Sequence, residues 1–307
     1  MTSKAKFERR TSEALRDLAV DRRSLMAIAA ASAPMIAFGS ATAQTTRTAP
    51  ALDRLEALVK MRGSTDARLG FSWMSGTRFA RVGQDLRAMC GLLNCTLSRY
   101  TRLSDEAYDL RLYEMSFYTN PETGRYQPRL AMPFTGRIVD VPLYRTGPGQ
   151  HIVKTSNREE MSWSRQNTTS EEAARQLAPD GNIFYAVDLS EPTIVGNDVW
   201  LTTEATTRLE PHSPDEKPWN YKEVITNHGR LDELSDPQVS HVQSVSSYTL
   251  VMDWRPWMHM DGVEGQTIDH AIGGRVWRID DLPDSIASHI REHHPDVAAD
   301  PAARLAA

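Results

Sequence analysis

Residues 108–118 read YDLRLYEMSFY, and the alternation in this stretch decides the fold class. Successive side chains of a β-strand point to opposite faces, so every second residue shares one face. The residues of one such face are Leu110, Leu112, Glu114, Ser116 and Tyr118. The turn sequence NPETG follows at residues 120–124 and predicts a tight reversal of the chain.

Strand patterns recur on both sides of this stretch. They cover residues 69–81, 97–103, 137–144, 183–189, 198–209, 221–227 and 239–254. Many short strands without a regular alternation of strand and helix favour an antiparallel sheet. A closed barrel leaves no exposed sheet edge and leaves room for a ligand inside. We therefore predict a mainly β (α+β) protein, with an antiparallel β-barrel-like domain and peripheral helices.

Few helices are expected. The spacing of apolar residues predicts them at residues 50–62, 86–93 and 282–290, and Ser170-Glu171-Glu172 is typical of a helix start. The proline-rich residues 210–219 form a loop long enough to act as a lid. After Pro295 the chain is rich in Ala and Asp. We expect a single domain over residues 44–295 and a flexible tail over 296–307.

The first residues have the features of an export signal. A basic leader precedes Arg22-Arg23, and an apolar stretch follows from Leu25 to Ala41. Ala41-Thr42-Ala43 supplies a small-x-small cleavage site. We expect residues 1–43 to be a twin-arginine signal peptide, and the twin-arginine export machinery to be a partner. The product would then be periplasmic or secreted. The alternative is an N-terminal amphipathic helix of the folded protein.

Composition narrows the function. The chain carries 35 Lys and Arg against 40 Asp and Glu, a net charge of −5, and cleavage would remove further basic residues. No basic stripe remains to hold nucleic acid, so we expect no nucleic-acid partner. No second segment is apolar enough for stable membrane insertion. Cys90 and Cys95 could form a disulfide or serve as two small buried residues.

Three motifs resemble those of a known family. They are Trp73-x-x-Gly76, Glu114-x-x-x-Tyr118 running into Thr123-Gly124, and the stretch Trp254-Arg255-Pro256-Trp257-Met258-His259-Met260. Together with the arginine pair they resemble DUF1838, a family named as a domain of unknown function, over roughly residues 52–276. Members are typically exported bacterial proteins, so the resemblance implies a fold and a compartment more than an activity. The stretch from Gly70 to Trp73 is also similar to the Gly-x-Trp opening of lipocalins. Its spacing is one residue longer, so the lipocalin (calycin) likeness is an analogy of fold alone.

The Trp- and Met-rich stretch is the candidate wall of a ligand pocket. Trp offers a large apolar face with one donor, and Met adapts to irregular shapes. We expect ligand-binding residues among Trp254, Trp257, Met258, Met260, Trp73, Tyr118 and Arg255. The alternative is that these residues plug the barrel.

His259 and Glu114 are the candidate catalytic residues. If His259 faces inward, a general acid or base lies beside the aromatic wall. Glu114 shares a strand face with Tyr118, and Arg111 or Arg255 could tune its pKa. The alternatives are a surface histidine and a solvated carboxylate.

Cofactors are not expected. His289 and His293 share a helix face, but no third ligand is obvious, so we predict no metal site. The sequence has no P-loop, nucleophile elbow or Rossmann glycine pattern. Two hypotheses remain. The first is a cofactor-independent lyase or isomerase acting on a hydrophobic, aromatic or polycyclic compound. The second is a non-catalytic periplasmic binding or carrier protein for such a hydrophobic small molecule.

Overall fold

The structure, a computed structural model, describes residues 52–164 and 180–306. These residues all belong to one compact unit, Pro50–Ala307. The predicted signal peptide and the predicted helix that starts at Ser170 lie outside the described residues. Within the described part, most of the chain is antiparallel β-structure, as the alternation predicts.

The strands are long on one half of the sheet and joined by short turns. They are β1 (Gly70–Val82), β2 (Asp85–Ser104), β3 (Ala107–Thr119), β4 (Arg129–Ala131), β5 (Ile138–Asp140), β6 (Tyr144–Val153), β7 (Ser156–Ser164), β8 (Asp180–Leu189), β9 (Thr193–Val195), β10 (Asp198–Pro211), β11 (Trp219–Arg230), β12 (Val245–Asp253) and β13 (Gln266–Val276).

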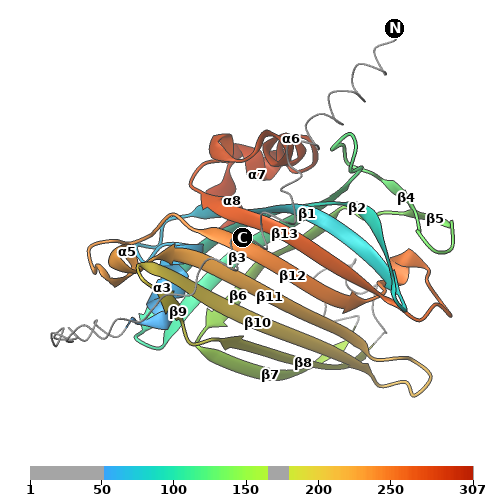
Figure 1. Cartoon of the computed structure of the whole chain (residues 1–307), viewed down its shortest axis with the longest axis horizontal. Helices are drawn as coiled ribbons and strands as arrows, with labels where there is room; N and C mark the ends of the chain where they lie inside the picture. Colours follow the sequence, from blue (N-terminus) through green and yellow to red (C-terminus); the bar gives the residue numbers. More distant parts are fainter. Residues whose placement is uncertain (1–51, 165–179, 307) are drawn as a thin grey trace, which may run out of the picture. The chain divides into compact units, whose positions relative to one another are not determined.

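One sheet makes the barrel-like wall. Its order is β6-β3-β2-β1-β13-β12-β11-β10-β8-β7, with β9 paired to β10 and β4-β5 forming a separate hairpin. Figure 1 shows the sheet curling, with β1 and β2 along the top of the view and β10 to β12 across its lower front. The two edge strands, β6 and β7, are separated in the chain only by Lys154 and Thr155. Among the described residues no ladder joins β6 to β7. The barrel is therefore nearly, but not fully, closed.

The helices are short and lie around the sheet. They are α3 (Arg54–Arg62), α5 (Leu231–Ser235), η1 (Pro256–Met258), η2 (Ile279–Asp281), α6 (Asp284–His293), α7 (Pro295–Ala299) and α8 (Pro301–Ala306). The described chain therefore confirms the predicted class, a β-barrel-like domain with peripheral helices.

Helix α3 closes one end of the barrel. Asp53 caps it, because Asp53 Oδ1 accepts hydrogen bonds from the amides of Leu55 and Glu56 at 2.9 and 3.0 Å. Leu58 packs with strand residues of β10, and Val59 packs against aromatic residues of β2 and β3. The helix stops at Gly63, where any Cβ would collide with the Tyr100 ring. Arg62, the last residue of α3, thereby lies over the barrel interior.

Two short segments close the other end. The β4-β5 hairpin and η1 supply Leu130, Val139 and Met258, which are buried against β-sheet residues such as Leu92 and Met252. We call this apolar group the cap cluster. It excludes water from the adjoining interior.

The outer face of β1, β2 and β3 is also covered, by α6, α7 and α8 (Figure 1). Phe71, Leu97 and Met115 pack there against residues of these helices. The sequence predicts a flexible tail after Pro295, and the structure differs: Val297 is fully buried and Leu305 is 6 % exposed in this outer cluster. Because α7 and α8 are short, each contributes too few apolar residues for composition to indicate this packing.

The predicted helix at residues 86–93 is wrong, because β2 runs through it. The run Met89-Cys90-Gly91-Leu92-Leu93 does not alternate, since both faces of β2 are buried here. Cys90 and Leu92 belong to the cap cluster, while Leu93 and Cys95 face the outer helices. A strand buried on both faces has a continuous apolar run that periodicity cannot separate from a helix. Cys90 and Cys95 are both free and buried.

Candidate functional site

The interior of the barrel holds a cavity of about 200 Å³. Alternate residues of β1, β2, β3, β11, β12 and β13 line it, together with Arg62 from α3 and Arg255 beside η1. A second space of about 70 Å³ adjoins it at the α3 end and shares Arg62, Met74 and Leu112 with it. Glu114 and Glu223 line only the larger space, so they lie further toward the cap than Arg62.

The lining of this cavity is dominated by side chains that can ionise or donate hydrogen bonds. They are the carboxyl groups of Glu114, Glu223 and Asp269, the guanidinium groups of Arg62, Arg78 and Arg255, and the phenols of Tyr118, Tyr144, Tyr221 and Tyr248. Such a lining suits a polar, directional interaction with a small molecule better than it suits a dry core.

Glu114 projects inward from the middle of β3. Asn94 on the adjoining strand donates from Nδ2 to Glu114 Oε1 at 2.7 Å and to the Ser116 hydroxyl at 2.9 Å. Burial raises the pKa of Glu114, and the charge of Glu223 raises it further. The hydrogen bond from Asn94 and the charge of Arg255 oppose this in part. Glu114 is therefore a fixed carboxyl group that holds its proton to a higher pH than an exposed glutamate.

Glu223 projects into the same cavity from β11. Tyr221, two residues earlier on the same strand face, donates a hydrogen bond to Glu223 Oε2. Burial raises the pKa of Glu223, while that hydrogen bond, the charge of Arg62 and a hydrogen bond from Tyr248 lower it in part. The negative charge of Glu223 is, after burial, the second cause of the raised pKa of Glu114.

A buried ion pair also lines the cavity. Arg78 and Asp269 stand opposite each other in the β1–β13 ladder. Arg78 Nε and Nη2 donate to the two Asp269 oxygens at 2.7 and 2.6 Å, with both side chains almost fully buried. The Arg78 guanidinium also lies 4.7 Å from the centre of the Tyr118 ring. Arg78 Nη1 is buried and has no hydrogen-bond acceptor among the described residues.

The cap side of the cavity is aromatic. Arg255 Cζ lies 5.5 Å from the Tyr144 ring centre and 5.7 Å from that of Trp219. Burial and the charge of Glu114 raise the pKa of Tyr144 to about 12, so its phenol remains a hydrogen-bond donor at neutral pH. Tyr118 contributes a further ring, 5.8 Å from that of Trp257.

The residues that the sequence predicts as ligand-binding separate into two groups. Tyr118 and Arg255 line the cavity. Met258 and Met260 are buried in the cap cluster, and Trp254 and Trp257 pack against it. Trp254 Nε1 also donates to the Val263 carbonyl at 3.0 Å. The Trp- and Met-rich stretch thus packs at one end of the barrel, in line with the alternative that these residues plug it. Of residues 254–260, Arg255 is the one that lines the cavity.

Trp73 and His259 lie elsewhere. Trp73 packs against the outer cluster beneath the C-terminal helices and also borders the smaller space at the α3 end. His259 is exposed at the end of η1 with φ of 48°. Pro256 starts the turn of η1, so strand alternation no longer applies at His259. The structure therefore does not bring His259 together with Glu114.

Glu223 is one of the site residues that sequence reasoning missed, with Arg62, Arg78 and Asp269. Tyr221, Glu223 and Ile225 share one strand face, which was the available signal. That Glu223 and Glu114 share one cavity could not be predicted. It depends on the order of the strands in the sheet, in which β3 and β11 are not neighbours.

A group of possible metal ligands occurs on α6. His289, Glu292 and His293 offer ligand atoms that all lie within 4.8 Å of one another. Packing accounts for the buried histidines: His289 Nε2 is 3.0 Å from the Gly124 carbonyl, and its ring stacks on Phe117 at 5.2 Å. Glu292 is exposed. We therefore regard these histidines as part of the interface that holds α6 on the sheet.

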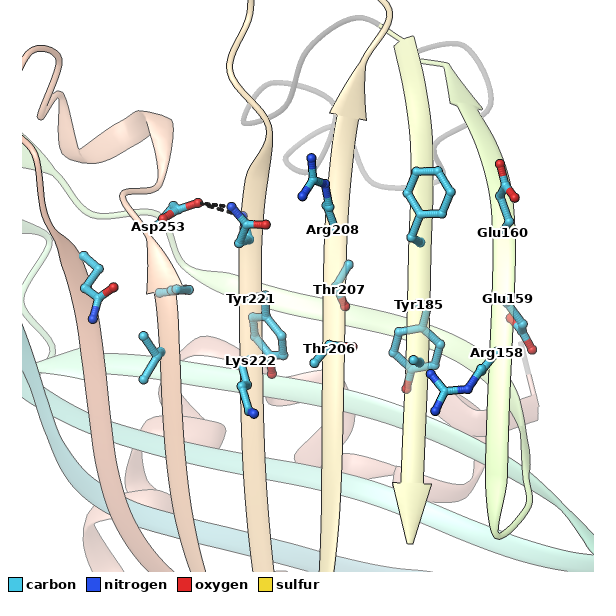
Figure 2. Close-up of a pocket in the computed structure, with 16 residues that line it drawn as sticks. Arg158, Glu159, Glu160, Tyr185, Thr206, Thr207, Arg208, Tyr221, Lys222 and Asp253 are labelled. Carbon is cyan, nitrogen blue, oxygen red and sulfur yellow. Dashed lines mark hydrogen bonds between the residues drawn. The ribbon is translucent and has the colours of Figure 1, made fainter.

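A larger hollow of about 680 Å³ is lined by residues of β7, β8, β10, β11 and β12 (Figure 2). On β11 it is lined by Asn220 and Lys222, and also by Tyr221, which lines the interior cavity too. Its cations pair with neighbouring carboxylates: Lys222 Nζ lies 2.6 Å from Glu204, and Arg208 Nε lies 2.6 Å from Glu210. These charged groups are solvent-exposed and mutually neutralised, so the interior cavity is the better candidate site.

Comparison with known proteins places the chain in one family. The family model described as "Protein of unknown function (DUF1838)" matches residues 68–306. The protein is thus β-barrel-like with a polar interior cavity, and the chain belongs to the DUF1838 family. No curated protein matches the sequence. Among the described residues, none of the helices has the length and apolar character needed to cross a membrane.

Proposed function

We propose that this exported protein binds a small molecule inside the barrel and that Glu114 and Glu223 transfer protons on it. The function is that of a lyase or isomerase that needs no cofactor. One observation carries the proposal: two partly buried carboxyl groups with raised pKa values line one interior cavity, and the charge of one raises the pKa of the other. Pairs of titratable groups held in different environments supply the acid and the base of a reaction.

The hydrogen bonds assign a role to each carboxyl group. Glu223 accepts from Tyr221, and hydrogen bonds to a carboxylate favour its ionised form. Glu223 is thus the base. Glu114 accepts from Asn94, but the negative charge of Glu223 raises its pKa, so Glu114 is the acid of the pair. In one turnover, Glu223 removes a proton from carbon or oxygen of the ligand. Glu114 then donates a proton to the position where electrons accumulate.

The cavity volume supports a smaller ligand than the sequence suggests. About 200 Å³ is below the roughly 300–1,000 Å³ of typical drug-sized sites. A compound with a single ring fits this space better than a polycyclic one. The tyrosine rings offer flat surfaces for such a ring.

Deuterium exchange tests the proposal and requires no assumption about which compound is the substrate. The purified protein is incubated in D₂O with a small-molecule extract of the cells that produce it, and mass spectrometry follows each compound. We expect at least one compound to gain deuterium or to be converted by the wild type. Glu114→Gln and Glu223→Gln should abolish that change. Glu204→Gln, an exposed residue of β10 paired with Lys222, is the matched control and should behave as the wild type.

The same experiment addresses the carrier alternative. The closure of the cavity at both ends by α3 and the cap cluster favours retention of a ligand. A compound that co-purifies with the protein and never exchanges deuterium would identify a binding protein. A change that persists in both glutamine variants would contradict the proposed acid and base.

A further inference from the structure

The charges around the cavity indicate the class of its ligand, and this inference rests on the function proposed above. Three guanidinium groups line the space, and that of Arg78 is neutralised there by Asp269. The Arg62 guanidinium makes no hydrogen bond or ion pair with any described residue, although Arg62 lines both adjoining spaces. Arginine remains charged at all relevant pH values. The α3 end of the cavity therefore carries a positive charge without a counter-ion in contact among the described residues.

The two glutamates supply the missing negative charge only in part, because the charges of Glu223 and Arg62 act on each other but no ion pair joins them among the described residues. Glu114 is held by Asn94, and Glu223 is held by Tyr221, so both are satisfied by neutral donors. Arg62 is partly buried, and a guanidinium group without a contacting counter-ion is free to bind an anion with two hydrogen bonds.

A second observation points to the same chemistry. Arg78 Nη1 is buried and lacks an acceptor among the described residues, although Nε and Nη2 are both occupied by Asp269. A buried donor without an acceptor loses its hydrogen bond to water and gains nothing in return. Since Arg78 lines the larger space but not the smaller one at the α3 end, an acceptor oxygen on the cap side of the ligand would satisfy this donor.

We propose that the ligand is a compact organic anion, a carboxylate carried on a single ring, and that Arg62 is the residue that selects its charge. The carboxylate lies toward α3, where the planar guanidinium can bind two oxygens at once. The ring then extends toward the cap, past Glu114 and Glu223 and against the tyrosines. This orientation follows from the lining, since Arg62 borders both spaces and the glutamates border only the larger one.

A matched pair of probes tests the inference. 4-Hydroxybenzoate is an anion, and 4-hydroxybenzamide has nearly the same shape without the charge. Isothermal titration calorimetry measures both with the wild type, Arg62→Gln, Arg62→Lys and Arg208→Gln. Arg208 is the control, because it is an exposed arginine on the outer face of β10. Thermal melting checks that each variant is folded.

We expect the wild type to bind the anion about tenfold or more tightly than the amide, since hydrogen bonds to charged groups are among the strongest. Arg62→Gln should remove that preference and leave amide binding nearly unchanged, while Arg62→Lys should retain part of it. Arg208→Gln should change nothing. Equal affinity of the wild type for the two probes, or an unchanged preference in Arg62→Gln, would overturn the inference. So would the failure of both probes to bind at millimolar concentration. The proton-transfer proposal is decided separately by the deuterium experiment.

Discussion

Arg78 and Asp269 face each other across the β1–β13 ladder and form two parallel hydrogen bonds, at 2.7 and 2.6 Å, inside the barrel. Because the pair is buried, loss of one partner leaves an uncompensated charge. The pair also holds the Arg78 guanidinium against the Tyr118 ring at the wall of the candidate site. The first prediction follows from this contact.

Asp269→Asn should lower the free energy of unfolding by about 3–5 kcal/mol, the usual result of breaking a buried ion pair. Urea denaturation followed by circular dichroism measures this loss. Lys222→Gln, which removes an exposed partner of Glu204, is the control and should cost less than about 1 kcal/mol. Equal losses in the two variants would show that the Arg78–Asp269 pair is not buried as described.

Glu114→Gln should stabilise the protein increasingly as the pH rises. A carboxyl group whose pKa is raised in the folded state favours folding when protonated, and this contribution is lost as the pH rises above the unfolded pKa. At pH 4 the variant should melt close to the wild type. At pH 8 it should melt higher, by about 2–4 °C for each kcal/mol gained. A gain that is the same at both pH values would contradict the raised pKa.

Leu305→Ala should lower the free energy of unfolding by about 2–5 kcal/mol, because Leu305 is buried against the outer face of the sheet. The exposed Ala302→Gln is the control and should remain within about 0.5 kcal/mol of the wild type. Urea denaturation distinguishes the two. If Leu305→Ala has no effect, the C-terminal residues form the flexible tail that composition predicts.

Replacement of Arg22 and Arg23 together by Lys should stop export, since the arginine pair is the recognised part of a twin-arginine signal. The uncut chain should accumulate in the cytoplasm, whereas the wild type should appear outside it with Gln44 as its first residue. Arg16→Lys, within the same basic leader, should be exported normally. Immunoblotting of cell fractions gives the result, and export of the double variant at the wild-type level would contradict the predicted signal.

The fold class could be predicted because the inner and outer residues of β3 differ in character. Leu112, Glu114 and Ser116 face the cavity, and Tyr113 and Met115 face the outer helices. Alternation fails where both faces are apolar, as in residues 89–93 of β2, and a helix is then predicted in error. Local patterns therefore predicted the strands that have one polar face.

The site could be predicted only in part. Glu114, Tyr118 and Arg255 were found because each belongs to a recognisable local motif. Arg62 and Glu223 were not, since their positions depend on how α3 closes the barrel and on which strands form opposite walls. His259 follows a proline that ends the strand, so its direction depends on the turn at η1.

The most direct test of the central claim is an NMR titration of the two glutamates, with ¹³C-labelled carboxyl groups, in the wild type and in Glu223→Gln. The account predicts that Glu114 titrates well above an exposed glutamate in the wild type. Its pKa should fall in Glu223→Gln, because the charge that opposes its ionisation is removed. An ordinary pKa for Glu114 in the wild type, or one that Glu223→Gln leaves unchanged, would contradict a coupled acid–base pair inside the barrel.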